Sequence, residues 1–280
     1  FPSYQFWTLE RSWKHPGILT GRRERKVALF YGCFMNFNRP DVGRTIRNLL
    51  SYLGYEVVIP PQTCCGLPAL GNYDEELASR YAQKNVRYLS PYVDAGYDIL
   101  YTCTSCGLTL THDYPSLLKV EGGKKIAENT YYLYDYLLST LAEKDLASLS
   151  GALKLKVAYH IPCHLKALGI GYPLVELLHR LPDLELSIHD EHCCGLAGSY
   201  GFKAENERTS LLIGERAAQG IKESRADVLI SDCGACRMQL KHLTGLDALD
   251  PAEIIARALL AKGVRLSFPQ LLFRSHPSEA

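Results

Sequence analysis

The sequence predicts an α/β protein with two tandem, pseudo-symmetric Rossmann-like domains, each containing a small parallel sheet. Short apolar segments typical of buried strands alternate with longer amphipathic segments typical of helices, and this order occurs twice. Strands that alternate with helices form parallel sheets covered by helices, with right-handed crossovers. The repeated spacing of the cysteines supports the same duplication and gives the length of its unit.

The first half is expected to fold in the order strand, helix, strand, helix, strand. The apolar run "KVALFYGC" predicts a buried strand that ends at Cys33, and "RPDVGRTIRNLLSYLGY" predicts an amphipathic helix. One face of that helix carries Ile46, Leu49, Leu50 and Leu53. We expect strands over 26–33, 56–61 and 97–103, and helices over 39–55 and 73–93. Each strand leads to a group of cysteines.

The second half repeats this order, which sets the predicted division of the chain. We expect strands over 155–163, 184–190 and 226–233, and helices over 173–181 and 203–224. The polar, small-residue stretch over 142–154 is expected to join the halves. We therefore predict a linker or docking arm over 1–25, domains over 26–148 and 149–265, and a C-terminal tail over 266–280. The missing initiator Met suggests a fragment or a processed chain.

All ten cysteines follow the repeat. Cys163 lies 130 residues after Cys33, the doublet Cys193 and Cys194 lies 129 residues after Cys64 and Cys65, and Cys233 and Cys236 lie 130 residues after Cys103 and Cys106. Chance matching at this level is about one in 10⁵ if cysteines are scattered at their average frequency. Parallel sheets bind ligands beyond the carboxyl ends of their strands. We therefore expect five sulfurs to converge at the edge of each sheet.

Several kinds of chemistry use many cysteines. Disulfides stabilise small secreted proteins, whereas this chain has 280 residues and no apolar segment typical of an export signal. Thioredoxin-like C-x-x-C centres would leave the other cysteines unexplained, and plain buried thiols would explain neither the spacing nor the doublets. Converging thiolates favour a soft metal site, which holds either zinc or an iron–sulfur cluster.

The number of cysteines in each half bears on this choice. A structural zinc and a cubane 4Fe–4S cluster each take four ligands, whereas each half supplies five cysteines. We interpret each doublet as one terminal and one bridging sulfur on different irons of an enlarged cluster. Gly66 and Gly195 would let the backbone approach such a cluster, and Gly198 and Gly201 would expose amide groups to it. A plain turn is the simpler interpretation of these glycines.

The second half has histidines near its cysteines that the first half lacks. His160, His164 and His192 correspond to Phe30, Phe34 and Thr63. These histidines are candidate proton donors, because histidine titrates near neutral pH. Their simpler role is hydrogen bonding around the metal ligands, or mere exposure to solvent.

Composition excludes other classes of function. Hydrophobic residues make up 47% of the chain and charged residues 22%, which is ordinary for a globular protein. The net charge of +1 gives no bulk attraction to nucleic acid or to an anionic membrane. No apolar run approaches the roughly 18 residues that span a bilayer. We expect a cytoplasmic protein that is held at the membrane, if at all, through partners.

The motifs C-x30-C-C-G-x36-C-x-x-C and C-x29-C-C-G-x37-C-x-x-C resemble those of the cysteine-rich CCG domain family. That family includes the B subunit of heterodisulfide reductase and iron–sulfur subunits of flavin dehydrogenases. The stretches "YHIPCHL", "CCGLAGSYGFKAEN" and "DCGACRMQL" are most similar to the C subunits of anaerobic glycerol-3-phosphate dehydrogenases. The resemblance covers about residues 1–262.

The resemblance implies two noncubane 4Fe–4S clusters, each held by five cysteines. The first ligand set would be Cys33, Cys64, Cys65, Cys103 and Cys106, and the second Cys163, Cys193, Cys194, Cys233 and Cys236. Some related sites hold zinc, so zinc in one of the two sites stays open. The dehydrogenase subunits of the family begin with a ferredoxin-like domain whose cysteine runs are absent from this sequence. That domain would therefore lie on another chain or on a lost segment.

We predict an iron–sulfur electron-transfer subunit of anaerobic respiration, which acts as the electron-carrying part of an oxidoreductase. By resemblance, electrons would come from glycerol 3-phosphate through a flavoprotein dehydrogenase subunit and a ferredoxin-type domain or subunit. They would go to a membrane quinone or another acceptor. The alternative is thiol–disulfide catalysis at the clusters, as in heterodisulfide reductase. A third possibility is a zinc-bound assembly module without redox function. The sequence assigns no catalytic residue.

Overall fold

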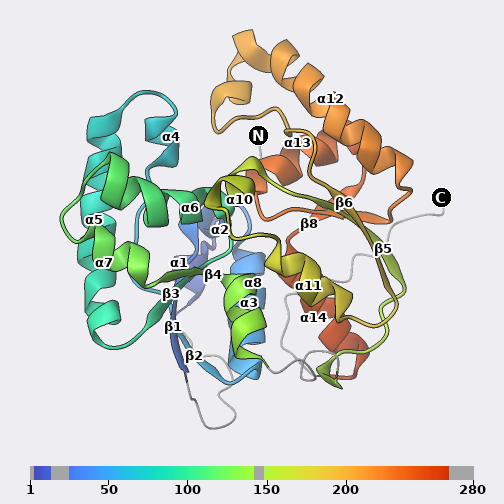
Figure 1. Ribbon diagram of the computed structural model, residues 1–280, viewed down its shortest axis with the longest axis horizontal. Coiled ribbons are helices and arrows are strands. Elements are labelled where there is room, and N and C mark those ends of the chain that lie inside the picture. Colours follow the sequence, from blue (N-terminus) through green and yellow to red (C-terminus); the bar gives the residue numbers. More distant parts are fainter. Residues whose placement is uncertain (1–2, 14–24, 142–147, 265–280) are drawn as a thin grey trace.

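The chain folds into two sheets of identical topology. The computed structural model describes residues 3–13, 25–141 and 148–264. Within these ranges it has two four-stranded, wholly parallel sheets, with strand orders β2-β1-β3-β4 and β6-β5-β7-β8. Figure 1 shows helices on both faces of each sheet. The predicted α/β class and the pseudo-symmetry of the two halves are confirmed. The predicted tail over 266–280 and parts of the predicted arm and join lie outside the described residues.

The first half places one crossover between each pair of successive strands. Its elements are β1 (Arg25–Phe30), α2 (Gly32–Phe37), α3 (Pro40–Tyr52), β2 (Tyr55–Val58), α4 (Leu67–Leu70), α5 (Glu75–Asp94), β3 (Asp98–Tyr101), α6 (Thr104–Leu108), a π-helix (Thr109–Leu117), α7 (Gly123–Glu128), β4 (Thr130–Tyr132) and α8 (Leu133–Thr140). Helix α3 begins with Pro40, whose fixed φ suits the first helical position. Helix α5 begins at the cap Asp74, whose side chain accepts from the Leu77 amide.

The second half repeats the arrangement. Its elements are β5 (Leu155–His160), α10 (Cys163–Leu168), α11 (Pro173–His179), β6 (Leu184–His189), two short 3₁₀ turns (Tyr200–Phe202 and Ala204–Asn206), α12 (Glu207–Glu223), β7 (Val228–Ile230), α13 (Gly234–Thr244), β8 (Asp247–Leu249) and α14 (Pro251–Ala261). Helix α14 begins with a capping box between Asp250 and Glu253.

The structure corrects two details of the predicted elements. The strands end earlier than predicted, so that Cys33 and Cys163 lie in the first turns of α2 and α10 instead of on strands. At Cys33 the change of direction falls on Gly32, which has a φ of +65°. The fourth strand of each sheet, β4 or β8, was not predicted. Each has only three residues, which is too short for a pattern.

The two halves share one hydrophobic core. The largest cluster of buried side chains includes Val27 and Leu29 of β1 together with Val157 and Tyr159 of β5. It is completed by apolar side chains of α3, α8, α11 and α14, which Figure 1 shows in the middle of the molecule between the two sheets. Two smaller clusters fill the outer faces, under α5 in the first half and under α12 in the second. The boundary between the predicted domains is therefore crossed by continuous packing.

The described part of the N-terminal arm packs on the first half. Helix α1 (Leu9–Ser12) buries Leu9 completely against Gly43 of α3, where any side chain would collide with that leucine. The Gln5 amide donates to the Phe37 carbonyl at the end of α2. Tyr4, Phe6 and Trp7 remain largely exposed. In the described ranges no helix is long and apolar enough to cross a membrane.

Candidate metal centres

The loops that follow β1, β2 and β3 bring the first five cysteines together. Hydrogen bonds between neighbouring thiols join them in the order Cys33, Cys64, Cys65, Cys106, Cys103. Strand β1 lies between β2 and β3, and the chain reverses its direction of crossover there. The loops after these three strands therefore meet at the switch point of the sheet, where α/β proteins bind ligands.

The second five cysteines form the same chain at the equivalent place. Their order is Cys163, Cys193, Cys194, Cys236, Cys233. The Cys236 thiol lies 3.2 Å from the Cys194 sulfur. All ten cysteines are free thiols, so no disulfide is present. The structure thus brings together each predicted set of five. The doublet takes the second and third places in each row of sulfurs.

Neighbouring thiols polarise one another strongly. In the first set, hydrogen bonds from Cys33 and Cys65 lower the pKa of Cys64 to about 3, and the bond from Cys106 lowers the pKa of Cys103. In the second set, the bond from Cys163 lowers the pKa of Cys193 to about 2, and the bond from Cys236 lowers the pKa of Cys233 to about 5. Each set therefore has two thiols poised to ionise beside three that keep their protons.

The donor chemistry suits a cluster of several irons. Five sulfurs cannot all ionise at such short separations unless cations neutralise them, and thiolates are the ligands of iron–sulfur clusters. In the described residues no group of three or more His, Cys, Asp or Glu side chains is arranged to hold a single metal ion. Cys33 and Cys163 at the row ends are exposed, while Cys65, Cys106, Cys194, Cys233 and Cys236 are buried.

The glycines directly after the doublets lie close to helices. Gly195 has a φ of +92°, and a Cβ there would lie 2.0 Å from the Ser210 carbonyl oxygen of α12. Gly66 has a φ of +106°, and a Cβ there would lie 3.3 Å from the Ala78 carbonyl oxygen of α5. Both therefore let the doublet loop approach a helix. Gly198, by contrast, has open space around it among the described residues.

Two buried side chains that sequence reasoning missed hold the first doublet. Asn85 of α5 donates to the Cys64 carbonyl and to the Tyr114 hydroxyl, each at 2.9 Å, and accepts from the Thr63 amide at 2.7 Å. Tyr114 in turn donates to the Cys65 carbonyl at 2.9 Å. Both side chains are fully buried. The doublet backbone is therefore fixed from one side by α5 and the π-helix.

A third missed side chain connects the doublet loop with the loop of Cys33. The Gln62 oxygen accepts from the amides of Tyr31 and Gly32, at 3.0 and 3.1 Å. Its nitrogen donates to the Leu29 carbonyl at 3.1 Å. Gln62 thereby fixes the distance between two parts of the first set. A single amide side chain in a loop carries no spacing signal, which explains why the sequence did not reveal it.

The two cysteine sets meet at the junction of the halves. A cavity of about 320 Å³ is lined by the five cysteines of the first set and by Cys233 of the second. Apolar side chains such as Phe34 and Met238 complete its wall. Close by, the buried carboxylate of Asp232 accepts hydrogen bonds from Tyr132 of the first half and Tyr159 of the second. This polar contact ties the halves together next to Cys233.

The three predicted histidines occupy different surroundings. His160 is buried, neither of its ring nitrogens has a hydrogen-bond partner among the described residues, and burial lowers its pKa to about 4. His164 Nδ1 lies 2.7 Å from the Ser105 hydroxyl of the first half. His192 is exposed, with Glu191 at 3.9 Å. The structure thus gives His164 a hydrogen-bonding role and His192 an exposed position.

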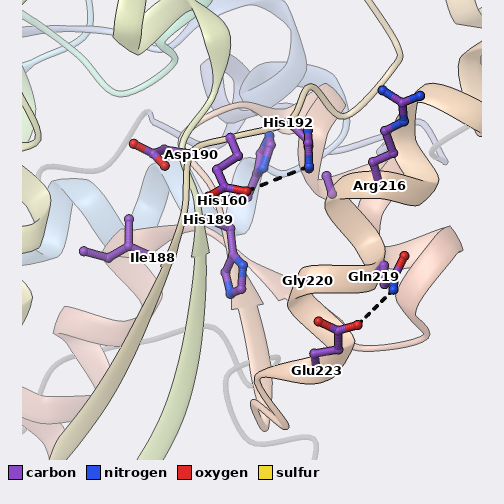
Figure 2. Close-up of a pocket in the computed structure, with 11 residues that line it drawn as sticks. His160, Ile188, His189, Asp190, His192, Arg216, Gln219, Gly220 and Glu223 are labelled. Carbon is purple, nitrogen blue, oxygen red and sulfur yellow. Dashed lines mark hydrogen bonds and ion pairs between the residues drawn. The ribbon is translucent and has the colours of Figure 1, made fainter.

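His160 borders a polar pocket of about 360 Å³ between the end of β6 and α12. Figure 2 shows His189 and His192 on the strand side of this pocket, and Arg216, Gln219 and Glu223 along the helix. None of the last three was predicted, because their spacing is that of an ordinary solvated helix face. A polar pocket that includes His160 therefore lies beside the second site. At the position that corresponds to His160, the first half has the apolar side chain of Phe30.

Comparison with known proteins places this geometry in a family. The model of the CCG cysteine-rich domain matches residues 27–111 and 157–241, which contain the two cysteine sets. The chain belongs to the CCG domain family. The resemblance inferred from the cysteine motifs is thereby confirmed. Both CCG domains follow the same strand order, and each carries its cysteines at the switch point of its sheet.

Relatives of this CCG protein include named redox subunits. The C subunit of anaerobic glycerol-3-phosphate dehydrogenase from Escherichia coli is 34% identical over 92% of the chain and 65% of the relative. The B subunit of fumarate reductase (CoM/CoB) from Methanothermobacter marburgensis is 26% identical over 82% of the chain and 44% of the relative. An uncharacterized iron–sulfur protein from Methanocaldococcus jannaschii is 29% identical over 77% and 41%. The chain thus spans less than two thirds of the length of these relatives.

A solved structure supports the fold of this tandem CCG chain. A hypothetical protein from Helicobacter pylori matches with a TM-score of 0.56, over 88% of this chain and 51% of the other. Its sequence identity is 14%, so the likeness concerns the fold.

Proposed function

We propose that the chain is an electron-transfer iron–sulfur subunit in which each half holds one noncubane 4Fe–4S cluster through five cysteines. The observation that carries this proposal is the pair of equivalent five-thiol rows at the switch points of the two sheets. The relative from M. jannaschii named as an iron–sulfur protein supports the same metal. When bound, such clusters would supply one-electron carriage.

The chain's own residues supply shape and charge around these clusters. Asn85, Tyr114 and Gln62 fix the first doublet, so that its sulfurs keep their separation when the charge changes. The buried sulfurs of each row are shielded from water, while the exposed Cys33 and Cys163 bring each site to the surface. Exposure at one end suits electron exchange with a partner protein.

Metal analysis tests the proposal directly. Anaerobically prepared protein should contain about eight irons and eight sulfides per chain, because two 4Fe–4S clusters require them. Stoichiometric zinc without labile sulfide would favour the assembly module and overturn the electron carrier. One zinc with four irons would confine the carrier role to one half.

The names of the relatives support a proposal for the upstream partner. The E. coli relative is named as a component of anaerobic glycerol-3-phosphate dehydrogenase, so we propose a flavoprotein dehydrogenase of that type as electron donor. A ferredoxin-type domain or subunit would lie between the two. The chain alone should not oxidise glycerol 3-phosphate, whereas adding the flavoprotein should couple that oxidation to reduction of the chain, visible as bleaching of its absorbance.

We propose a membrane quinone as the downstream acceptor. The apolar side chains around the junction cavity favour a weakly polar acceptor over an anionic disulfide. They are equally compatible with an acceptor that stays outside this cavity. The competing function is disulfide reduction at the clusters. It is favoured by the lining of that cavity by cysteines of both sets and by the relative named for CoM and CoB.

A stopped-flow experiment separates these two functions. Pre-reduced protein is mixed with either a water-soluble quinone or a CoM/CoB heterodisulfide, and reoxidation is followed by absorbance. We expect fast reoxidation by the quinone. Fast reoxidation by the disulfide with release of two thiols, and none by the quinone, would replace the carrier by the reductase.

A further inference from the structure

One side chain of the first half reaches the second cysteine set. Ser105 lies between Cys103 and Cys106 in the first C-x-x-C motif, on helix α6. Its hydroxyl lies within hydrogen-bond distance of His164 on helix α10 of the other half. The Ser105 oxygen lies 2.7 Å from His164 Nδ1 and 3.9 Å from the Cys233 sulfur. Ser105 thus directly precedes Cys106 of one set in the chain and touches a cysteine of the other set.

The chemistry of these three groups selects one direction of hydrogen bonding. A hydroxyl has a single proton, and a metal-bound sulfur can only accept. If His164 carries its proton on Nδ1, it donates to Ser105, and the Ser105 proton is free to point at Cys233. With the other tautomer, Ser105 would donate to His164 and Cys233 would receive nothing. The first arrangement satisfies all three groups, so we assign His164 the Nδ1–H tautomer.

The first cysteine set lacks the equivalent contact. The residue that corresponds to Ser105 is Ala235, which has no hydroxyl, and the residue that corresponds to His164 is Phe34. A side chain at Gly234 would lie 2.5 Å from the Phe34 ring, so this contact is apolar and tight. The guanidinium of Arg237 lies 5.8 Å from that ring, but it is paired with Asp250 at 2.9 Å. The two pseudo-equivalent contacts between the halves therefore differ in polarity.

A hydrogen bond to a ligating sulfur raises the reduction potential of an iron–sulfur cluster, because it stabilises the added negative charge. We propose that Ser105, oriented by His164, raises the potential of the second site above that of the first, so that an electron shared between them rests on the second. This inference rests on the proposed function, since it needs both sites to hold clusters. In the exchange the first site is oxidised by one electron and the second is reduced by one, and no bond breaks.

The position of Ser105 also makes it a bridge between the sites. Its main chain is bonded directly to Cys106 and, through Thr104, to Cys103, and its hydroxyl contacts Cys233. The path from first to second set therefore needs only one non-bonded step at this point. The Ser105 contact would thus both raise the potential of the second site and link the two sites, which an ordinary packing contact would not do.

The test is a redox titration of the anaerobically reconstituted full chain, followed by EPR. A variant in which Cys233 and Cys236 are both replaced by alanine assigns the signals of the first site. In the parent protein we expect the second site to be reduced first. In Ser105→Ala the second site's potential should fall, changing the electron partition by about tenfold, which is 59 mV for a one-electron couple. Ser105→Thr keeps a hydroxyl and should restore the parent values.

Ala235→Ser is the matched control. It places a hydroxyl at the equivalent position, where Phe34 offers no group to orient it, so we expect no change in either potential. Equal potentials in the parent, or no shift of the second site in Ser105→Ala with iron content unchanged, would overturn the inference while leaving the electron carrier intact. Absence of iron from the parent protein would overturn the carrier function and the inference with it.

Discussion

Cys194 lies in the middle of the second sulfur row. It is buried, and it contacts both its neighbour Cys193 and Cys236, whereas Cys163 stands exposed at the end of the row. Two thiols that differ so much in surroundings should differ in function when metal is bound. A sulfur in the middle of a row can join two metal ions, whereas a sulfur at the end serves one.

Replacing Cys194 should therefore change the type of cluster. In the cluster that we propose, Cys194→Ser would remove a bridging sulfur, and we expect a cubane-like EPR signal with iron content near that of the parent protein. Cys163→Ser, at the exposed end, is the comparison and should mainly lower the iron content. An unchanged spectrum in Cys194→Ser would show that this thiol is not a ligand.

Asn85 should support the first doublet through its backbone. In Asn85→Ala the buried Cys64 carbonyl and Thr63 amide lose their partner, which costs about 1–3 kcal/mol for each group left unpaired. We expect this loss in the free energy of unfolding by urea, together with faster loss of iron to a chelator. Ser90→Ala on the same helix, whose hydroxyl donates to the Val86 carbonyl, should change stability by less than about 1 kcal/mol. Equal effects of the two variants would refute the role of Asn85.

At this scale the sequence revealed the ten cysteines and missed the residues that hold them. Cysteine is rare and its spacing is repeated, so both sets could be predicted from the sequence alone. Asn85, Tyr114 and Gln62 act mainly through hydrogen bonds to backbone groups, which depend on the folded path of distant loops. No local pattern in the sequence records such a path.

At the scale of elements, each doublet loop must approach a helix closely. Gly195 lies against α12 with room for no Cβ, and Gly66 lies against α5 with slightly more space. A Cβ at Gly66 would require its neighbours to move by only a few tenths of an ångström. A Cβ at Gly195 would overlap the nearest backbone oxygen. The second loop is therefore the more sensitive of the two.

Alanine substitutions should rank these contacts. Gly198→Ala costs about 1–2 kcal/mol for its positive φ alone, because no described atom lies within reach of the added carbon. Gly195→Ala should add about 1–3 kcal/mol for the collision with the Ser210 carbonyl, and Gly66→Ala should fall between the two. Thermal unfolding of the three variants measures the ranking. A Gly198→Ala variant as unstable as Gly195→Ala would contradict it.

Most longer elements could be predicted because their apolar residues recur with a clear period. Helices α3, α5 and α12 fall within a few residues of their predicted ranges. Strands β4 and β8 could not be predicted, because three residues pair with a neighbour only once the rest of the sheet exists. Likewise, sulfurs expected at strand ends lie in the following helical turn.

At the scale of the whole molecule, the halves should unfold together. Their largest core is common to both, and buried contacts such as those of Asp232 cross the junction. We expect a single calorimetric transition whose enthalpy agrees with the van't Hoff value. Residues 25–141 produced alone should expose the inner faces of α3 and α8 and aggregate. Two resolved transitions, or a soluble and cooperatively folded 25–141 fragment, would contradict this expectation.

The duplication was evident from the sequence, but the shared core was not. The amphipathic pattern of α3 shows that one face is buried, and it does not show what covers that face. The covering surface comes from α14 of the other half, with Arg39 and Glu253 at 3.0 Å beside it. The predicted boundary near residues 148 and 149 stays a prediction about chain topology.

The matched strand orders have a consequence for how such a protein can change. Two separate copies of one half, paired around a twofold axis, would be obliged to carry the same residue at both equivalent contacts. When the two copies are joined in one chain, the equivalent positions can differ, as Ser105 and Ala235 do here. A mutation in a fused pair alters one cysteine site and spares its twin. Covalent linkage thus lets selection change the two sites one at a time, which the potential difference that we propose between them requires.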